Sequence, residues 1–174
     1  MFLQETYVIK DSIFADVGVT GKHNTNWWNT QSTDITISTD NTGTTVSNTA
    51  TSGYSRDHAY DGSPIPSGWN DKIALMESMF TKPFAVEFNI LTPGTGNGIF
   101  LSNGSNTITK YFSEISATAN SHIKIICDGS TAKFYRDGTL ISTDNYTIGS
   151  TSSFAFRVNN QSAIKYNNLC IYPI

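Results

Sequence analysis

The chain has 174 residues, a length that suits one domain, and 38% of them are hydrophobic whereas only 14% are charged. A net charge of −3 excludes electrostatic binding of nucleic acid and argues against binding to an anionic membrane. No apolar run reaches the roughly 18 residues of a membrane span. Ser, Thr and Asn number 20, 23 and 16, whereas 10 Phe, 8 Tyr and 3 Trp argue against disorder because so many rings need burial. This composition favours an all-β domain with a polar, weakly charged surface.

Along most of the chain, apolar residues alternate with polar ones, which is the pattern of half-buried strands. The predicted strands, in chain order, are residues 7–9, 34–39, 44–48, 84–91, 99–102, 107–112, 122–127, 132–136, 140–143, 154–158, 163–166 and 169–172. We expect 34–39 to pair with 44–48 across the turn between them. Asp128-Gly129 and Asp137-Gly138 predict tight hairpins, because such turns require positive φ. Short strands at this spacing indicate a β-sandwich or barrel in one domain, residues 1–174.

Residues 71–80 have an ambiguous period. Ile73, Met76 and Met79 fit the stripe of an amphipathic helix. Ile73 and Leu75 equally fit the alternation of a strand. Both interpretations stay open.

Two predicted strands carry polar residues opposite an apolar face. In residues 84–91 and 154–158 the apolar side chains recur at every second position. Four polar residues therefore point away from the predicted core and are candidates to line one shared surface: Glu87, Asn89, Arg157 and Asn159. The alternative is an ordinary solvated sheet in which Glu87 and Arg157 form a cross-strand pair.

Several segments resemble those of a known superfamily. Residues 84–90 look like a central jelly-roll strand, residues 122–141 like paired strands with a Tyr-x-Asp-Gly hairpin, and residues 153–173 like closing strands. Their order resembles the concanavalin A-like jelly rolls, which include legume lectins, laminin-G-like domains and glucanases. The resemblance implies an all-β fold, an antiparallel two-sheet jelly-roll β-sandwich. It does not imply one function, because this fold hosts lectins, adhesion modules, viral fibre domains and enzymes.

The residues that catalysis would need are missing from the strand where this superfamily carries them. Its hydrolases place carboxylates on one strand as Glu-x-Asp-x-x-Glu, because residues i and i+2 share a face. Here Glu87 is followed by Asn89 and by no further acid on that strand. A Gly-x-Ser-x-Gly nucleophile elbow is also absent from the sequence. The sequence therefore predicts a protein that is not an enzyme.

Aromatic residues near polar loops are candidates to stack on sugar rings. Trp28 follows Trp27, and adjacent residues of an extended chain point to opposite sides, so only one of them fills a core easily. Trp69 lies in a loop rich in Gly, Pro and Ser, and Tyr60 comes just before that loop. We predict Trp28, Trp69 and Tyr60 as ligand contacts, with plugging of the sandwich end as the alternative for Trp69.

The resemblance also bears on metal binding. Jelly-roll modules often hold a structural Ca²⁺ between their terminal segments, which implies Asp11, Asp16 and Asn168 as ligands here. No other cofactor is expected. Cys127 and Cys170 lie in apolar strands and are expected to be buried thiols, with a disulfide as the alternative if their strands are neighbours.

A hydroxyl-rich surface on a jelly roll favours a domain that binds glycans outside cells. The N-terminal residues lack the basic segment, apolar core and cleavage site of a signal peptide. A viral structural protein reconciles these observations, because virion proteins fold in the cytoplasm and later meet a host surface. We therefore expect a virion-associated or tail-fibre domain that recognises a cell-surface polysaccharide. The alternatives are a carbohydrate-binding or adhesion module of a larger secreted protein, and a structural module that binds other virion proteins; an oligomer is compatible with each.

Overall fold

The computed structural model describes residues 14–16, 35–49, 51, 54–60, 72–75, 83–103, 107–149 and 153–174. Within these ranges the chain forms thirteen strands and no helix. Accordingly, no helix in the described part of the chain is long and apolar enough to cross a membrane.

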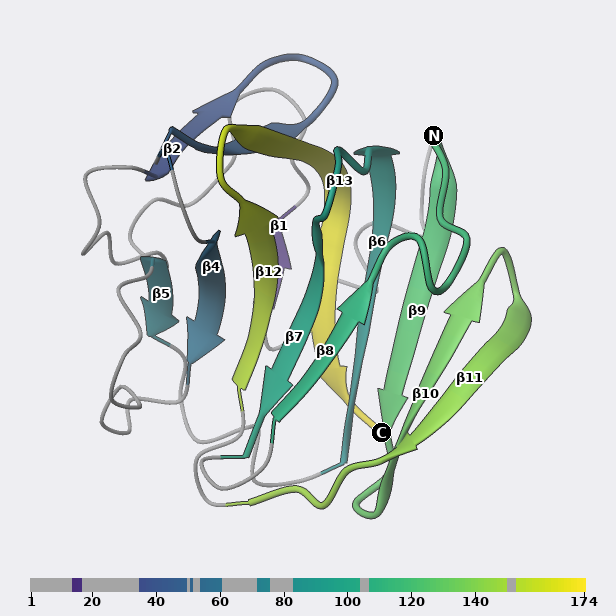
Figure 1. Cartoon of the computed structure of the whole chain (residues 1–174). Coiled ribbons are helices and arrows are strands. Elements are labelled where there is room, and N and C mark those ends of the chain that lie inside the picture. Colours follow the sequence, from purple (N-terminus) through teal and green to yellow (C-terminus); the bar gives the residue numbers. More distant parts are fainter. Residues whose placement is uncertain are drawn as a thin grey trace.

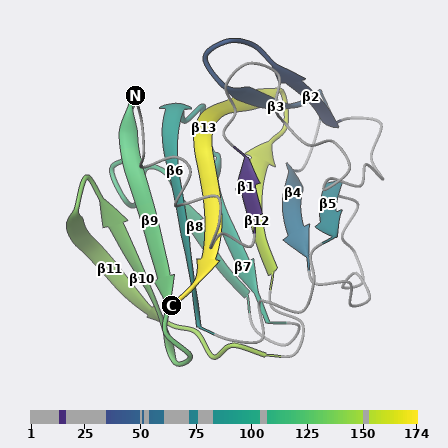
Figure 2. The same cartoon turned by 180° about the vertical axis from the view of Figure 1, so that it is seen from behind.

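The strands form two sheets that pack face to face, seen from opposite sides in Figures 1 and 2. The eight-stranded sheet has the order β11 (Thr139–Asn145), β10 (Thr131–Arg136), β9 (Ser121–Cys127), β6 (Phe84–Thr92), β13 (Ser162–Pro173), β3 (Thr44–Asn48) and β2 (Ile35–Thr39), and β1 (Phe14–Asp16) pairs with β13. The five-stranded sheet has the order β5 (Lys72–Leu75), β4 (Tyr54–Tyr60), β12 (Ser153–Asn159), β7 (Gly98–Ser102) and β8 (Thr107–Tyr111). Neighbouring strands are antiparallel, except β4 and β5, which are parallel. The predicted two-sheet β-sandwich is confirmed.

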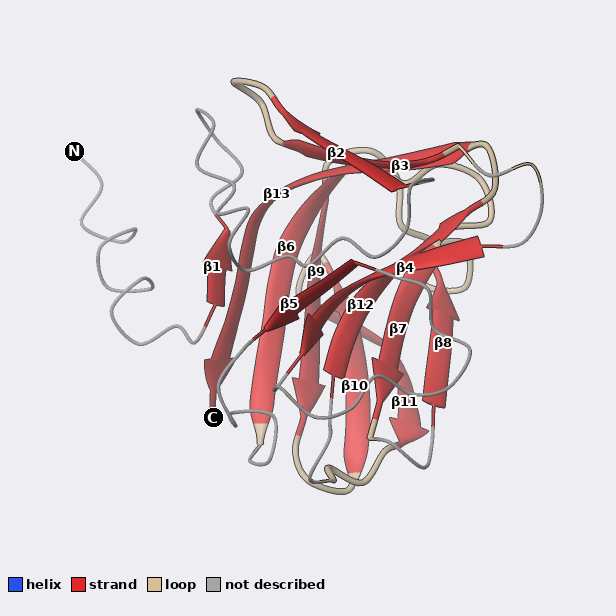
Figure 3. Ribbon diagram, turned by 90° about the vertical axis from the view of Figure 1, so that its left-hand side faces the viewer, coloured by secondary structure: helices blue, strands red, loops and turns tan. Residues whose placement is uncertain are grey.

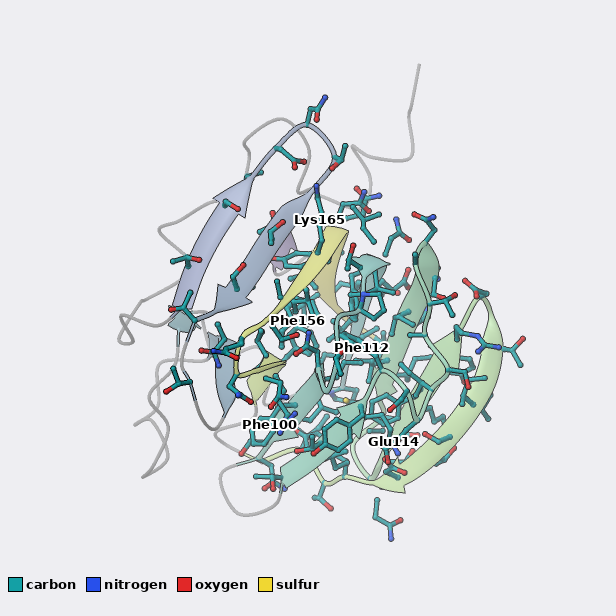
Figure 4. The ribbon with its side chains drawn as sticks, turned by 45° about the horizontal axis from the view of Figure 1, so that its top comes forward. Phe100, Phe112, Glu114, Phe156 and Lys165 are labelled. Atoms are coloured by element: carbon teal, nitrogen blue, oxygen red, sulfur yellow. The ribbon has the colours of Figure 1, made fainter. Side chains whose placement is uncertain are left out.

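Aromatic rings from both sheets meet in the core. The ring centroid of Phe156 on β12 lies 5.0 Å from that of Phe88 on β6 and 4.7 Å from that of Tyr166 on β13. Phe154 adds a further contact with Phe156 at 5.2 Å. Burial of one such side chain stabilises the fold by about 1.5–3 kcal/mol. Figure 4 shows Phe156 and Phe112 among the packed side chains, and Figure 3 shows the β2–β3 hairpin at one end of the sandwich.

The structure agrees with most of the predicted strands that it describes. The alternation in residues 84–91 is confirmed, because the apolar residues at every second position of β6 are buried. In the ambiguous segment 71–80, residues Lys72–Leu75 form strand β5, as the strand interpretation of Ile73 and Leu75 expects. The rest of the segment, with Met76 and Met79, lies outside the described residues. The predicted strand at 7–9 lies outside the described residues. Strand β4 was not predicted, because its sequence Tyr-Ser-Arg-Asp-His-Ala-Tyr has no apolar alternation.

One strand, β13, replaces two predicted ones. Between Asn167 and Cys170 it advances three residues while its partner β6 advances two, so one residue is extra and forms a β-bulge. Asn168 in this bulge has a φ of 54°. The extra residue changes which alternate positions face the core, so Tyr166 and Leu169 are both buried there despite their odd spacing.

The two Asp-Gly turns differ. Asp137 and Gly138 have φ values of 50° and 80°, so the predicted tight turn with two positive φ angles is confirmed there. At the other turn only Gly129 of the pair has a positive φ, of 107°. The Asp128 carboxylate instead accepts hydrogen bonds from the backbone N–H groups of Ser130, at 3.1 Å, and Thr131, at 2.9 Å, which closes a longer loop.

The two cysteines are buried and do not bond to each other. Cys127 belongs to the core cluster, and its burial raises the pKa of its thiol. Cys170 lies opposite Glu87, whose neighbours along β6 face the core, so the two thiols lie on opposite faces of one sheet. The expectation of buried thiols is confirmed.

Candidate functional site

Polar side chains gather on the outer face of the eight-stranded sheet. Glu87 of β6 lies opposite Lys124 of β9, and Lys124 lies opposite Tyr135 of β10. Asn89 and His122 form the next such pair along β6 and β9. Directly opposed residues share a face, and the core residues occupy the alternate positions, so these side chains point outward.

Tyr172 of β13 joins this group through hydrogen bonds. The Lys124 ammonium Nζ lies 2.7 Å from Glu87 Oε1 and donates to the Tyr172 hydroxyl at 3.1 Å. The Tyr172 hydroxyl in turn donates to the same Glu87 oxygen. His122 Nε2 lies 3.4 Å from the second carboxylate oxygen, Glu87 Oε2. We call this group the outer polar patch; its members are Glu87, Asn89, His122, Lys124, Tyr135 and Tyr172.

Hydrogen bonds set the charge states in the patch. Burial alone would raise the pKa of the Glu87 carboxyl, but hydrogen bonds from Lys124 and Tyr172 outweigh burial and hold that pKa below its ordinary value. Desolvation opposes the charge of Lys124, yet its bonds to Glu87 and Tyr172 raise the pKa of the ammonium. Burial and the bond to Glu87 raise the pKa of the Tyr172 phenol. At neutral pH the patch therefore holds one carboxylate, one ammonium and a neutral phenol beside His122.

A chain of amides connects the patch to the β2–β3 turn. Asn89 Nδ2 donates to Asn167 Oδ1 at 3.0 Å, and Asn167 Nδ2 donates to the backbone oxygen of Thr42 at 3.0 Å. At the same end, Lys165 Nζ lies 2.6 Å from Asp40 Oδ2, and Figure 4 shows Lys165 near this hairpin. The turn is thereby held against the sheet at the edge of the patch.

The predicted shared surface of Glu87, Asn89, Arg157 and Asn159 is wrong. Glu87 and Asn89 lie in the eight-stranded sheet, whereas β12, which carries Arg157 and Asn159, lies in the five-stranded sheet between β4 and β7. The predicted Glu87–Arg157 pair is wrong for the same reason, and Glu87 pairs with Lys124 instead. Side-chain parity identifies which residues face away from the core, but it does not say to which sheet a strand belongs.

Arg157 and Asn159 occupy a different polar surface. The Arg157 guanidinium donates to the backbone oxygen of Gly96 and lies 4.8 Å from the centroid of the Tyr111 ring. The backbone N–H of Asn159 donates to Asn97 Oδ1 at 2.8 Å. As ligand contacts, Arg157 and Asn159 stay predictions, and they would serve a surface separate from the outer polar patch.

Most of the remaining predicted site residues lie outside the part of the chain that the structure describes. Trp28, Trp69 and Asp11 are outside the described residues, and for Tyr60 in β4 and Asp16 in β1 only the backbone is described.

The predicted calcium ligands Asp16 and Asn168 lie on β1 and β13, which pair with each other. Asp16 lies opposite Leu169, which places its backbone beside Asn168. In the described ranges no three His, Cys, Asp or Glu residues are grouped to hold a metal ion. Calcium stays a prediction, which thermal unfolding in Ca²⁺ and in EDTA would test.

Four members of the patch were not among the predicted site residues: His122, Lys124, Tyr135 and Tyr172. Parity within the predicted strands 122–127, 132–136 and 169–172 already turns all four side chains away from the core. What the sequence lacked was the strand order β10-β9-β6-β13, which brings them beside Glu87.

The arrangement suits recognition better than acid catalysis. It presents a charged acceptor at Glu87, a charged donor at Lys124 and groups at His122 and Tyr172 that can donate or accept. A general acid requires a raised carboxyl pKa, whereas the pKa of Glu87 is lowered.

Comparison with known proteins identifies the fold. No protein-family model matches the sequence, and no curated protein matches it. A solved structure of a protein of unknown function with a galectin-like fold from Bacillus subtilis aligns over 93% of this chain and 96% of its own length, with 10% identity and a TM-score of 0.56. A sialidase aligns over 94% of this chain with 12% identity and a TM-score of 0.54, and the chain spans 19% of the length of that sialidase. The carbohydrate-binding module CBM66 from Bacillus subtilis aligns over 86% of this chain and 97% of its own length, with 14% identity and a TM-score of 0.48.

The two alignments with TM-scores of 0.56 and 0.54 cover 93% and 94% of this chain, respectively, and show a similar fold over nearly its whole length. The protein has the concanavalin A-like jelly-roll fold that its sequence resembled.

Proposed function

We propose that this protein binds glycans through the outer polar patch and performs no chemistry on them. The observation that carries the proposal is the row Tyr135, Lys124 and Glu87, three residues in register across β10, β9 and β6. Sugar rings present apolar C–H faces and a rim of hydroxyls. A Tyr ring beside a fixed set of hydrogen-bonding groups is suited to both features.

The polar groups are held in place before any ligand arrives. Lys124, Tyr172 and Glu87 bond to one another, which restrains three side chains that would otherwise lose rotamer freedom on binding. Each immobilised side chain costs about 0.5–1.5 kcal/mol of affinity. This prior ordering supports a binding role.

An apolar neighbour extends the row. Leu140 of β11 lies opposite Tyr135 and is 49% exposed. An exposed Leu alone needs no explanation, but here it adds apolar area next to the ring that would stack on sugar. A ligand longer than one sugar unit would use this area.

We further propose that the protein acts outside cells, on a virion or at a cell surface, with a polysaccharide as its partner. A composition rich in Ser, Thr and Asn with only 14% charged residues supports this setting. A module of a larger secreted protein remains the first alternative, and a structural module that binds only virion proteins the second. A gene flanked by genes for virion proteins would support the viral setting, and a gene inside a polysaccharide-degradation cluster would contradict it.

The test of glycan binding uses the variant Tyr135→Ala. Loss of a stacking ring at a binding site weakens affinity by about tenfold or more, which isothermal titration with a ligand found on a glycan array would measure. The matched control is Thr109→Ala, at an exposed position on β8 of the other sheet, and it should bind like the wild type. Trp28→Ala and Trp69→Ala test the two predicted Trp contacts in the same assay.

Two results would overturn the proposal. One is a wild-type protein that binds no glycan on a broad array of cell-surface polysaccharides. The other is a Tyr135→Ala variant that is folded by circular dichroism and binds as tightly as the wild type.

A further inference from the structure

We infer that the outer polar patch selects neutral glycans and rejects anionic ones, such as those that carry carboxylate or sulfate groups. This inference depends on the proposed glycan binding and adds the class of ligand to it. The observation that supports it is that the positive side chains described in the eight-stranded sheet are paired with carboxylates.

Each Lys or Arg side chain described in this sheet has a carboxylate within ion-pair distance. The pairs are Lys124–Glu87 at 2.7 Å, Lys133–Asp128 at 2.8 Å, Arg136–Asp137 at 3.7 Å and Lys165–Asp40 at 2.6 Å. Recognition of an anionic sugar uses a cation whose charge is available to the ligand. In the described part of this sheet, the positive charges are already matched.

The Glu87 carboxylate makes the centre of the patch unfavourable for an anion. Its Oε1 accepts from Lys124 and Tyr172, while its Oε2 faces His122 at 3.4 Å. The hydrogen bonds keep the carboxyl ionised at neutral pH. An anionic group that approached Lys124 would therefore meet a like charge beside its intended partner.

A neutral hydroxyl meets no such conflict. It can donate to Glu87 Oε2 and accept from His122 or Lys124, because a hydroxyl carries one donor and two acceptor sites. The His122 side chain beside Glu87 Oε2 is 44% exposed, so it is accessible to a ligand. The patch is thus matched to the hydroxyl rim of an uncharged sugar.

The test compares glycans in pairs that share one backbone and differ by a terminal sialic acid or a sulfate. At low ionic strength, where charges are little screened, the wild type should bind the neutral member about tenfold or more tightly than the anionic one, as expected for one like charge near contact at a partly exposed site. Glu87→Gln keeps the shape and removes the charge, which leaves Lys124 uncompensated. This variant should gain about tenfold in affinity for the anionic member.

Two further variants act as controls. Asp128→Asn also frees a cation, Lys133 of β10, while the Glu87 carboxylate stays in the patch, so the preference should change less than in Glu87→Gln. Lys124→Gln leaves Glu87 charged and should bind the anionic member no better than the wild type. Because Glu87→Gln is expected to gain affinity for the anionic member whereas Lys124→Gln is not, a general loss of folding cannot imitate the result.

The outcomes separate the two proposals. Tighter wild-type binding to the anionic members would overturn this inference and leave glycan binding in place. Absence of binding to either member of every pair would remove the proposed function, and this inference with it. A Glu87→Gln variant that is folded but keeps the wild-type preference would show that Glu87 does not control selection.

Discussion

A buried amide, Asn97, joins the loop after β6 to both sheets. Its Nδ2 lies 3.0 Å from the backbone oxygens of Pro93 and Ala163, and its Oδ1 accepts from the backbone N–H of Asn159 at 2.8 Å. Asn97 is 2% exposed, and a buried polar group is tolerated when its partners are satisfied. One side chain thereby connects β13 of one sheet with β12 of the other.

We expect Asn97→Ala to lower the free energy of unfolding by about 2–3 kcal/mol, because it leaves several buried polar groups without their partner. Urea denaturation would measure the change. Asn160→Ala removes a weaker amide bond, 3.3 Å to the backbone oxygen of Thr51, and should stay within about 0.5 kcal/mol of the wild type. Equal stabilities for the two variants would contradict the proposed contribution of the Asn97 amide to stability.

At the scale of elements, the bulge in β13 determines which of its side chains reach the core. A strand has a period of two, so a shift by one residue moves every later side chain to the other face. The extra residue at Asn168 allows Tyr166 and Leu169 to face inward on one continuous strand. The same shift turns Tyr172 outward, opposite Ala85 and toward Glu87. The bulge thus builds part of the outer polar patch.

Asn168 in this bulge has a positive φ of 54°, so the stability of the protein should depend on which residue occupies this position. Asn168→Val should destabilise the protein by about 1–2 kcal/mol, because a β-branched residue is strained in the left-handed region. Asn168→Gly should be neutral or slightly stabilising, because glycine adopts this conformation freely. Thermal unfolding of both variants without added calcium would measure the difference, and a Val variant as stable as the Gly variant would refute the role of φ.

At the scale of the whole molecule, β8 and β11 are edge strands of the two sheets. Lys110 of β8 lies opposite the core residue Ile99, so its side chain points inward and is 13% exposed. Its Nζ lies 2.7 Å from Asp144 of β11 and 5.2 Å from the centroid of the Phe134 ring. An inward-pointing charge on an edge strand discourages pairing with the edge of another molecule.

We therefore predict that Lys110→Met increases self-association, which light scattering would detect, because a second molecule could then add to the β8 edge without burying a charge. Its melting temperature should stay close to that of the wild type, since Asp144 is 29% exposed and can be hydrated once its partner is removed. Lys110→Arg keeps the charge and should scatter like the wild type. Unchanged scattering by the Met variant would rule out this role for the charge.

The sequence predicted much of the fold but only part of the candidate site. The alternation around Glu87 and the φ angles at Asp137-Gly138 depend on residues close in the chain, and both were predicted correctly. The patch needed more, because Lys124, Tyr135 and Tyr172 come from three other strands. Strand order between distant segments is decided by packing of the whole core, which local patterns do not contain.

By itself the sequence determined an all-β domain and which face of each predicted strand is apolar, and its resemblance to the concanavalin A-like superfamily implied the jelly-roll sandwich. Only the tertiary structure decided which polar faces lie together. Glu87 and Arg157 are both outward-facing by parity, yet they belong to different sheets on opposite sides of the core. The physical reason is that parity follows from the geometry of one strand, whereas the partners of Glu87 follow from hydrogen bonding between strands far apart in the chain.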